Sequence, residues 1–270
     1  MLISRENNRM AEIITVANQK GGVGKTTTAI NLAAALACFG QETLLIDLDP
    51  QGNASSGLGV SPDSEENGTY QSLFGITEPE KTIKNTGLEM LDLMPSNGDM
   101  ISAEIDLCDQ VSRENKLKDA ISKLSGLYKF IIIDCPPSLG LLTINALSAS
   151  SSVIIPIQSE YYALEGLANF VRTVERVRTT INPKLVIEGV VITMFDPRIT
   201  LSQQVHQELK KSFSEVLFKT PIPRSIRLAE APSHGKSVLQ YDPRSKGSQA
   251  YLAVAGEFLA RRGWEVVRLD

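Results

Sequence analysis

The chain has 270 residues and a formal net charge of −4, with 42% hydrophobic and 21% charged residues. These fractions are close to those of ordinary globular proteins, so they exclude a wholly disordered or fibrous chain. No apolar run reaches the about 18 residues of a membrane span, and the polar first ten residues hold no apolar signal-peptide core, so we expect a cytoplasmic protein.

Five continuous apolar runs predict buried strands. They lie at residues 13–17, 43–48, 130–135, 152–157 and 186–193. Between them apolar residues recur at spacings of three and four, most clearly at 26–40 and 163–181, which predicts helices. Continuous Ile/Val strands joined by such helices are typical of βαβ units. We therefore predict an α/β fold: a doubly wound, mostly parallel sheet with helices on both faces and ligands at the carboxyl ends of its strands.

The domain organisation is expected to be simple. The polar residues 1–10 are predicted to form a flexible N-terminal arm, and Met10, directly before the first strand, is an alternative start of the protein. No internal repeat or low-complexity linker divides the rest of the chain, so residues 11–270 are predicted to form one domain.

A glycine-rich segment, KGGVGKTT, follows the first predicted strand and opens the first predicted helix. Glycines let the backbone wrap closely around a phosphate, so that successive N–H groups and the helix N-terminus face the anion. The segment comprises Lys20, Gly21, Gly22, Val23, Gly24, Lys25, Thr26 and Thr27, and its backbone is predicted to bind phosphate. Lys25 adds a positive charge near the β and γ phosphates of ATP, and the hydroxyl of Thr26 is a ligand for Mg²⁺. The general P-loop pattern has glycine at position 19, whereas Gln19 followed by Lys20 matches the "deviant" Walker A form with an additional lysine.

Carboxylates follow two further predicted strands. Asp47 and Asp49 end the run LLIDLD and are expected to face the same crevice, and Asp134 ends the run FIIID. Asp134 has the position of a Walker B aspartate, which holds Mg²⁺ through water. Any one of these residues is also open to a structural interpretation, as a helix cap or a turn residue. Three of them in one chain with a P-loop favour a nucleotide site.

Five motifs in order resemble the ParA family of chromosome- and plasmid-partitioning ATPases, and more closely its short chromosomal type, often called Soj. They are KGGVGKTT, LIDLDPQGN, IIIDCPPSLG, TMFDPR and IPRSIRLAEAPSHGKSV. The resemblance covers residues 11–260. It implies a protein that binds Mg-ATP, forms a nucleotide sandwich homodimer and then binds DNA without sequence specificity. Such a protein is nucleoid-associated, and it hydrolyses ATP slowly until a ParB-type centromere-binding partner stimulates it, which segregates chromosome origins or plasmids.

The resemblance also implies roles for individual residues. Lys20, Asp49 and Lys25 are the expected catalytic residues. Lys20 reaches across the dimer to the partner subunit's phosphates and stabilises transition-state charge. Asp49 positions or activates the attacking water, and Asp47 and Asp134 support the Mg²⁺ shell.

For the adenine the resemblance points to the segment 221–225. Pro223 is the expected packing surface for the base. Ser225 stands where many family members carry asparagine, and it is the second expected contact.

A basic C-terminal third supports an expected DNA interface. Residues 1–170 carry 11 Lys+Arg against 21 Asp+Glu, whereas residues 171–270 carry 16 against 10. The resemblance points to two arginines as phosphate contacts, and nearby cations extend the same face: Arg198, Arg227, Lys236, Arg244 and Lys246. Contacts of this kind are non-specific and depend steeply on salt. The simpler alternative is that these are ordinary surface cations.

Two alternatives to a DNA-bound ATPase share some of these motifs. A MinD-like or cargo-positioning ATPase would act on a membrane or a protein scaffold, but Gly263 interrupts the C-terminal segment around Trp264, so we expect no membrane partner. The second alternative is a metabolic P-loop enzyme, such as a relative of the nitrogenase iron protein or an ATP-dependent carboxylate ligase. The first of these would need cluster-ligating cysteines, and Cys38, Cys108 and Cys135 do not fit that role.

Overall fold

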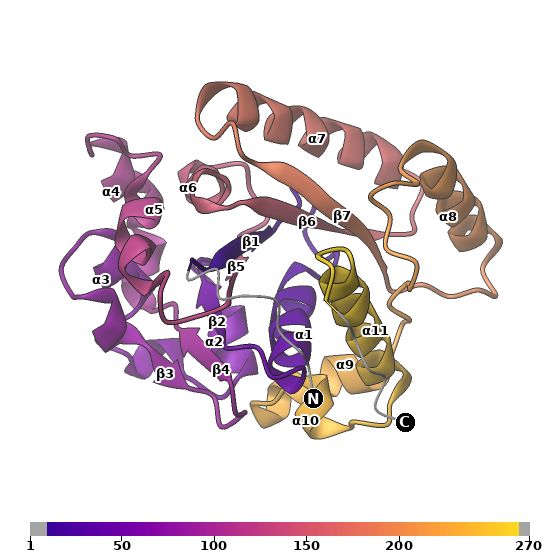
Figure 1. Ribbon diagram of the computed structural model, residues 1–270, viewed down its shortest axis with the longest axis horizontal. Coiled ribbons are helices and arrows are strands. Elements are labelled where there is room, and N and C mark those ends of the chain that lie inside the picture. The colour runs from indigo at the N-terminus through magenta and orange to yellow at the C-terminus, as the bar shows by residue number, and fades with distance from the viewer. Residues whose placement is uncertain (1–9, 265–270) are drawn as a thin grey trace.

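A mostly parallel sheet forms the centre of the computed structural model, which describes residues 10–264 (Figure 1). Within that range the sheet has seven strands in the order β3-β4-β2-β5-β1-β6-β7. Their bounds are β1 Glu12–Val16, β2 Thr43–Asp47, β3 Lys84–Asn85, β4 Leu91–Met94, β5 Phe130–Asp134, β6 Ser152–Gln158 and β7 Val186–Thr193. Every neighbouring pair is parallel except β3 with β4.

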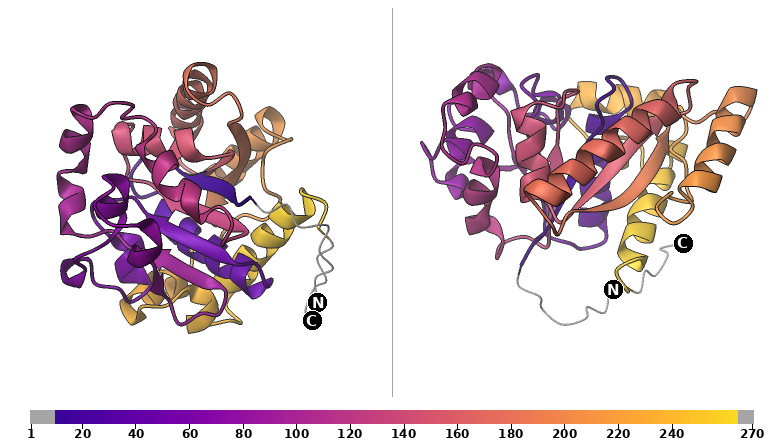
Figure 2. Two further views of the ribbon diagram at one scale, coloured as in Figure 1. Left: turned by 60° about the vertical axis from the view of Figure 1, so that its left-hand side comes forward. Right: turned by 90° about the horizontal axis from the view of Figure 1, so that it is seen from above.

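The helices cover both faces of this sheet, as predicted (Figures 1 and 2). Their bounds are α1 Lys25–Cys38, α2 Asn53–Gly57, α3 Thr69–Leu73, α4 Ala103–Cys108, α5 Lys116–Ile121, α6 Leu141–Ala149, α7 Ala163–Thr180, α8 Thr200–Ser212, α9 Ile226–Glu230, α10 Val238–Tyr241 and α11 Lys246–Ala260. One core layer joins the sheet to α4–α7, and the other joins it to α1, α10 and α11. No helix in the range 10–264 is long and apolar enough to cross a membrane.

Strand residues alternate between the two core layers, because successive side chains of a strand point to opposite faces. On β5, Ile131 and Ile133 belong to the layer of α4–α7, and Phe130 and Ile132 belong to the layer of α1 and α11. Both faces are therefore buried, which explains why this strand is a continuous apolar run in the sequence.

The five predicted strands are confirmed, and two strands were missed. β4 has only four residues, Leu91–Met94, and the polar Asp92 interrupts its apolar character. β3 has two residues and pairs antiparallel with β4 at the edge of the sheet. Such short edge strands have too few side chains to show a period. The predicted arm at 1–10 lies outside the described residues except for Met10, and one domain over 11–270 stays a prediction.

β1 lies in the middle of the sheet, between β5 and β6. After β1 the chain passes through α1 and builds the half of the sheet that holds β2 and β5. It then crosses to the other side of β1 and adds β6 and β7. The carboxyl end of β1 is thus the point where the winding of the sheet reverses, where open α/β sheets bind their ligands.

A close contact on β7 gives a stability prediction. A Cβ at Gly189 would lie 2.3 Å from a ring carbon of Phe218 and 2.9 Å from the carbonyl oxygen of Val216. We expect Gly189→Ala to lower the free energy of unfolding by about 1–3 kcal/mol, because an added methyl group in a packed core forces its neighbours apart. Gly166→Ala in α7 is the matched control, since a Cβ there meets no atom within 4 Å and alanine is favoured in helices. Urea unfolding of both variants checks the difference, and equal stabilities would contradict it.

Candidate functional site

The loop between β1 and α1 has the backbone geometry of a phosphate site. Gly22 (φ 73°) and Gly24 (φ 82°) have left-handed conformations that favour glycine. The first helical bond of α1 runs from the N–H of Thr28 to the carbonyl of Gly24 over 2.9 Å. The amides of residues 24–27 have no acceptor within the part of the chain that the structure describes. These amides at a helix N-terminus are therefore available to an anion.

Lys25 lies over this loop. Its Nζ donates to the carbonyl oxygen of Lys20 at 3.0 Å, so the side chain folds back along the glycine-rich turn. Burial lowers the pKa of Lys25, and the nearby carboxylates of Asp134 and Asp49 oppose that shift. The ammonium group thus lies among the carboxylates that the sequence predicted to meet here.

Asp134 is a fully buried carboxylate at the end of β5. Both of its oxygens are buried without a partner among the described residues. Burial raises the pKa of Asp134 well above its usual value, and the charge of Asp47, its register partner on β2, adds to the rise. The hydroxyl of Thr26 and the ammonium of Lys25 act in the opposite direction. A buried carboxylate beside a threonine hydroxyl and open phosphate-binding amides fits the hard oxygen ligands that Mg²⁺ requires.

Asp47 has a different environment. Its Oδ2 accepts hydrogen bonds from the N–H and the hydroxyl of Ser55, both at 2.7 Å, and its Oδ1 accepts from the N–H of Asp49 at 3.2 Å. Burial raises the pKa of Asp47 to about 6, although the bonds from Ser55 lower it. The carboxylate holds the first turn of α2, which is the structural alternative left open by the sequence. The structure therefore favours Asp134 over Asp47 as the carboxylate with oxygens left for a cation.

This difference predicts unequal effects on magnesium. We expect Asp134→Asn to raise the Mg²⁺ concentration needed for nucleotide binding by about 10- to 100-fold. Loss of a residue that supports a metal site usually lowers metal affinity by this factor. A fluorescent ATP analogue titrated with Mg²⁺ measures the change. The control is Asp92→Asn on β4, where the carboxylate accepts a hydrogen bond from the Tyr128 hydroxyl. An unchanged Mg²⁺ dependence in Asp134→Asn would remove this residue from the metal shell.

Asp49 lies just beyond the end of β2, in the following loop, and not on the strand with Asp47 as predicted. It is only 5% exposed. Its Oδ1 accepts a hydrogen bond from the N–H of Gln51 at 3.0 Å, which turns the loop at this point. Asp49 and Lys25 both line the same cavity.

That cavity has a volume of about 440 Å³ and lies over the P-loop. Its lining combines residues of the P-loop and α1 with residues from four other segments: Gly22, Gly24, Lys25, Thr26, Thr27, Ile30, Asn31, Asp49, Asn53, Pro137, Met194, Ala231, Pro232 and Lys236. Met194 in TMFDPR and Ala231-Pro232 in EAPSHGK belong to motifs that the sequence singled out, although these residues were not predicted as contacts. Asn53 lies in the motif LIDLDPQGN and Pro137 in the motif IIIDCPPSLG, and this membership was the available signal for them.

Several predicted contacts do not line this cavity. Pro223 forms a bridge to Phe195, the residue after Met194, and Ser225 precedes α9. The lining on this side comes instead from Ala231 and Pro232. Gly21 and Val23 form the loop without facing the cavity.

Lys20 is the P-loop residue whose side chain leaves the site. Its Nζ forms an ion pair with Glu160, which follows β6, and the Lys20 side chain is 43% exposed. Glu160 was not predicted as a site residue, and its place after a predicted strand was the available signal. The ammonium of the additional lysine therefore points to Glu160 and does not line the cavity, although the backbone of Lys20 belongs to the loop.

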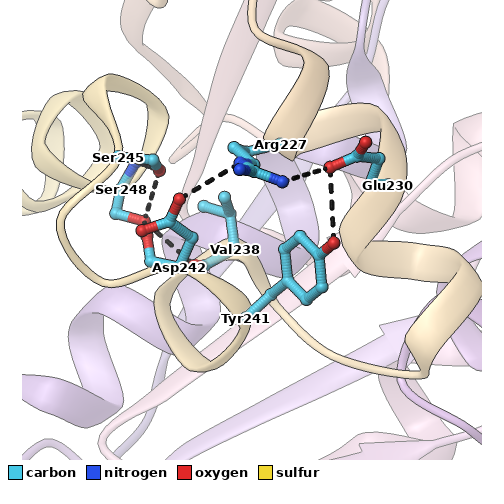
Figure 3. Close-up of polar contacts among 7 residues, drawn as sticks. All are labelled: Arg227, Glu230, Val238, Tyr241, Asp242, Ser245 and Ser248. Carbon is cyan, nitrogen blue, oxygen red and sulfur yellow. Dashed lines mark hydrogen bonds and ion pairs between the residues drawn. The ribbon is translucent and has the colours of Figure 1, made fainter.

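The predicted DNA-binding cations fall into different environments. Arg198 is exposed and pairs with Asp196 at 2.7 Å, and Arg227 pairs with Glu230 and Asp242 (Figure 3). The remaining cations are exposed: Lys236, Arg244 and Lys246. Lys236, however, lines the nucleotide cavity. The role of Lys236 in a DNA-binding face stays a prediction.

The fold and the site together define a P-loop nucleoside triphosphatase of the deviant Walker A type. Comparison with known proteins narrows the class. Residues 11–187 match a family model described as an AAA domain. The sporulation initiation inhibitor protein Soj of Bacillus subtilis is 52% identical over 251 residues, which are 93% of this chain and 99% of that protein. The chromosome partitioning protein ParA of Myxococcus xanthus is 48% identical over 93% of this chain and 89% of its own length. The chain belongs to the ParA/Soj family of partitioning ATPases, so the predicted resemblance is confirmed.

A solved structure supports the same fold. Cobyrinic acid a,c-diamide synthase from Mycobacterium smegmatis superposes with a TM-score of 0.83 at 38% identity, covering 94% of this chain and 96% of that one. That protein was solved with ADP and magnesium, and also with an ATP analogue and magnesium.

Proposed function

We propose that this partitioning ATPase binds Mg-ATP at the P-loop cavity, forms a homodimer and then binds double-stranded DNA non-specifically. A ParB-type partner stimulates ATP hydrolysis, and hydrolysis releases the ATPase from the DNA. Repeated binding and release on the nucleoid segregate chromosome origins or plasmids. The observation that carries the proposal is the position of Lys20. Its ammonium pairs with Glu160, its side chain is 43% exposed, and it does not line the cavity of its own chain. Once that ion pair opens, the ammonium is free to reach the nucleotide of a second copy.

Within one chain, binding and hydrolysis divide among few groups. The amides of residues 24–27 and the ammonium of Lys25 bind the phosphates. Thr26 and Asp134 would hold Mg²⁺, which when bound neutralises charge on the phosphate oxygens. Asp49 orients the attacking water and accepts its proton.

DNA binding is proposed for the surface that carries Arg198 and Arg227. Arginine binds phosphate through two parallel N–H donors, and contacts to the backbone carry no sequence information. Only a dimer would align two such surfaces on one duplex. ATP would then control DNA affinity through the dimer geometry, without touching the DNA.

The test is binding to random-sequence double-stranded DNA with ATP, with ADP and without nucleotide. Asp49→Ala holds the ATP state, and Arg227→Glu removes the proposed contact. Arg178→Glu on α7 is a matched charge reversal, since Arg178 pairs only with its neighbour Glu175 among the described residues. We expect binding only with ATP, weakened by salt and lost in Arg227→Glu alone. A protein that dimerises with ATP but binds no DNA would contradict the proposal and favour a MinD-like or cargo-positioning ATPase on a membrane or protein scaffold.

A further inference from the structure

Arg227 lies between two carboxylates from different segments (Figure 3). Its Nη1 donates to Oε2 of Glu230 at 2.9 Å, and its Nε lies 3.2 Å from Oδ2 of Asp242. Glu230 ends α9, whereas Asp242 lies between α10 and α11. The Arg227 side chain remains 52% exposed, and those of Glu230 and Asp242 are 40% and 34% exposed. A phosphate in solution can therefore reach the same guanidinium.

Further contacts hold the Glu230 carboxylate and the backbone of Asp242. The hydroxyl of Tyr241 donates to Oε2 of Glu230 at 3.3 Å, and the Tyr241 ring stacks on His234 at a centroid distance of 4.8 Å. The carbonyl oxygen of Asp242 accepts a hydrogen bond from the Ser248 hydroxyl at 2.6 Å, near the start of α11. Arg198 differs, because its partner Asp196 is only two residues away in the same turn.

A guanidinium has a limited set of N–H donors, and carboxylate and phosphate compete for the same ones. The two acids also repel a phosphate that approaches Arg227. We propose that Glu230 and Asp242 form an acidic clamp that competes with the DNA backbone for Arg227 and thereby limits the affinity for DNA. This inference rests on the proposed DNA-binding function and adds to it the residues that restrain the contact.

The clamp predicts tighter DNA binding when either acid is neutralised. We expect Asp242→Asn and Glu230→Gln each to lower the dissociation constant for random-sequence duplex by about two- to fivefold with ATP, the range expected from one exposed ion pair. The double variant is expected to reach about tenfold. The matched control is Glu175→Gln on α7, which makes the same change in net charge and breaks a pair with Arg178.

An Arg227→Gln background separates a direct clamp from a general charge effect. At low salt other cations keep some DNA binding in this background. The clamp substitutions are then expected to raise DNA affinity no more than Glu175→Gln does. Thermal unfolding checks that the variants fold. If Asp242→Asn does not fold, Glu230→Gln alone tests the clamp.

The outcomes are distinguishable. Either of two results would overturn the clamp and leave the proposed function intact. In the first, the wild-type protein binds DNA with ATP while the clamp variants bind no more tightly than Glu175→Gln. In the second, the clamp substitutions raise DNA affinity equally in the Arg227→Gln background. Absence of ATP-dependent DNA binding in the wild-type protein would overturn both.

Discussion

Lys20→Ala is expected to lower the rate of ATP hydrolysis by about 10²- to 10³-fold, the range measured when one charge-stabilising donor is removed from a transition state. Nucleotide affinity should change little. The Lys20 ammonium points to Glu160 and is half exposed, whereas Lys25 and the amides of residues 24–27 face the cavity. The carbonyl oxygen that anchors Lys25 belongs to the backbone of residue 20 and survives the substitution.

Two further variants separate the possible causes of such a loss. Glu160→Gln breaks the same ion pair but keeps the lysine, so it should hydrolyse ATP with a partner at least as well as the wild-type protein. Lys25→Ala should lose nucleotide affinity as well as turnover, because its ammonium group lies at the phosphate loop. Single-turnover hydrolysis, ATP-analogue affinity and sedimentation with ATP give the three readouts. A Lys20→Ala protein that dimerises and hydrolyses ATP normally would contradict the cross-dimer role.

The predictable part of the fold was the part with strong local periodicity. β5 is buried on both faces, so its residues are apolar without interruption and are easily recognised in the sequence. The P-loop was predictable because its glycines and its lysine are adjacent in the chain, and the structure gives Gly22 and Gly24 the left-handed backbone that such a turn requires.

The choice of partner for each charged side chain was not predictable. Asp47 and Asp134 end similar apolar runs, yet Ser55 of α2 bonds only to Asp47, and within residues 10–264 neither oxygen of Asp134 has a hydrogen-bond partner. That difference depends on how the loop after β2 folds back on the strand ends. Lys20 and Glu160 lie 140 positions apart, and their contact depends on the order in which β1 and β6 pair in the sheet.

The loop after β2 also positions Asp49, which with Lys20 is one of the two groups expected to affect turnover most. Asp49→Ala is expected to reduce the rate of hydrolysis by about 10²- to 10⁴-fold, the usual contribution of a positioned general base, while ATP binding persists. Asp49 is nearly buried, faces the cavity with Lys25, and uses Oδ1 to accept the N–H of Gln51. Its role is thus separable from that of Asp134, whose oxygens have no hydrogen-bond partner in the described part of the chain.

Asp49→Asn distinguishes a base from a positioning group, because an amide still accepts the N–H of Gln51 but cannot take a proton from water. If the carboxylate acts on the water, both variants lose turnover to a similar extent. Both should then remain on DNA in the presence of ATP after the partner is added, whereas the wild-type protein is released. If asparagine restores most of the rate, Asp49 acts by shaping the loop, and wild-type turnover in the alanine variant would remove it from the catalytic residues. Rapid-quench measurements of ATP hydrolysis with and without the partner, run beside DNA-release assays, give both readouts for the same preparations.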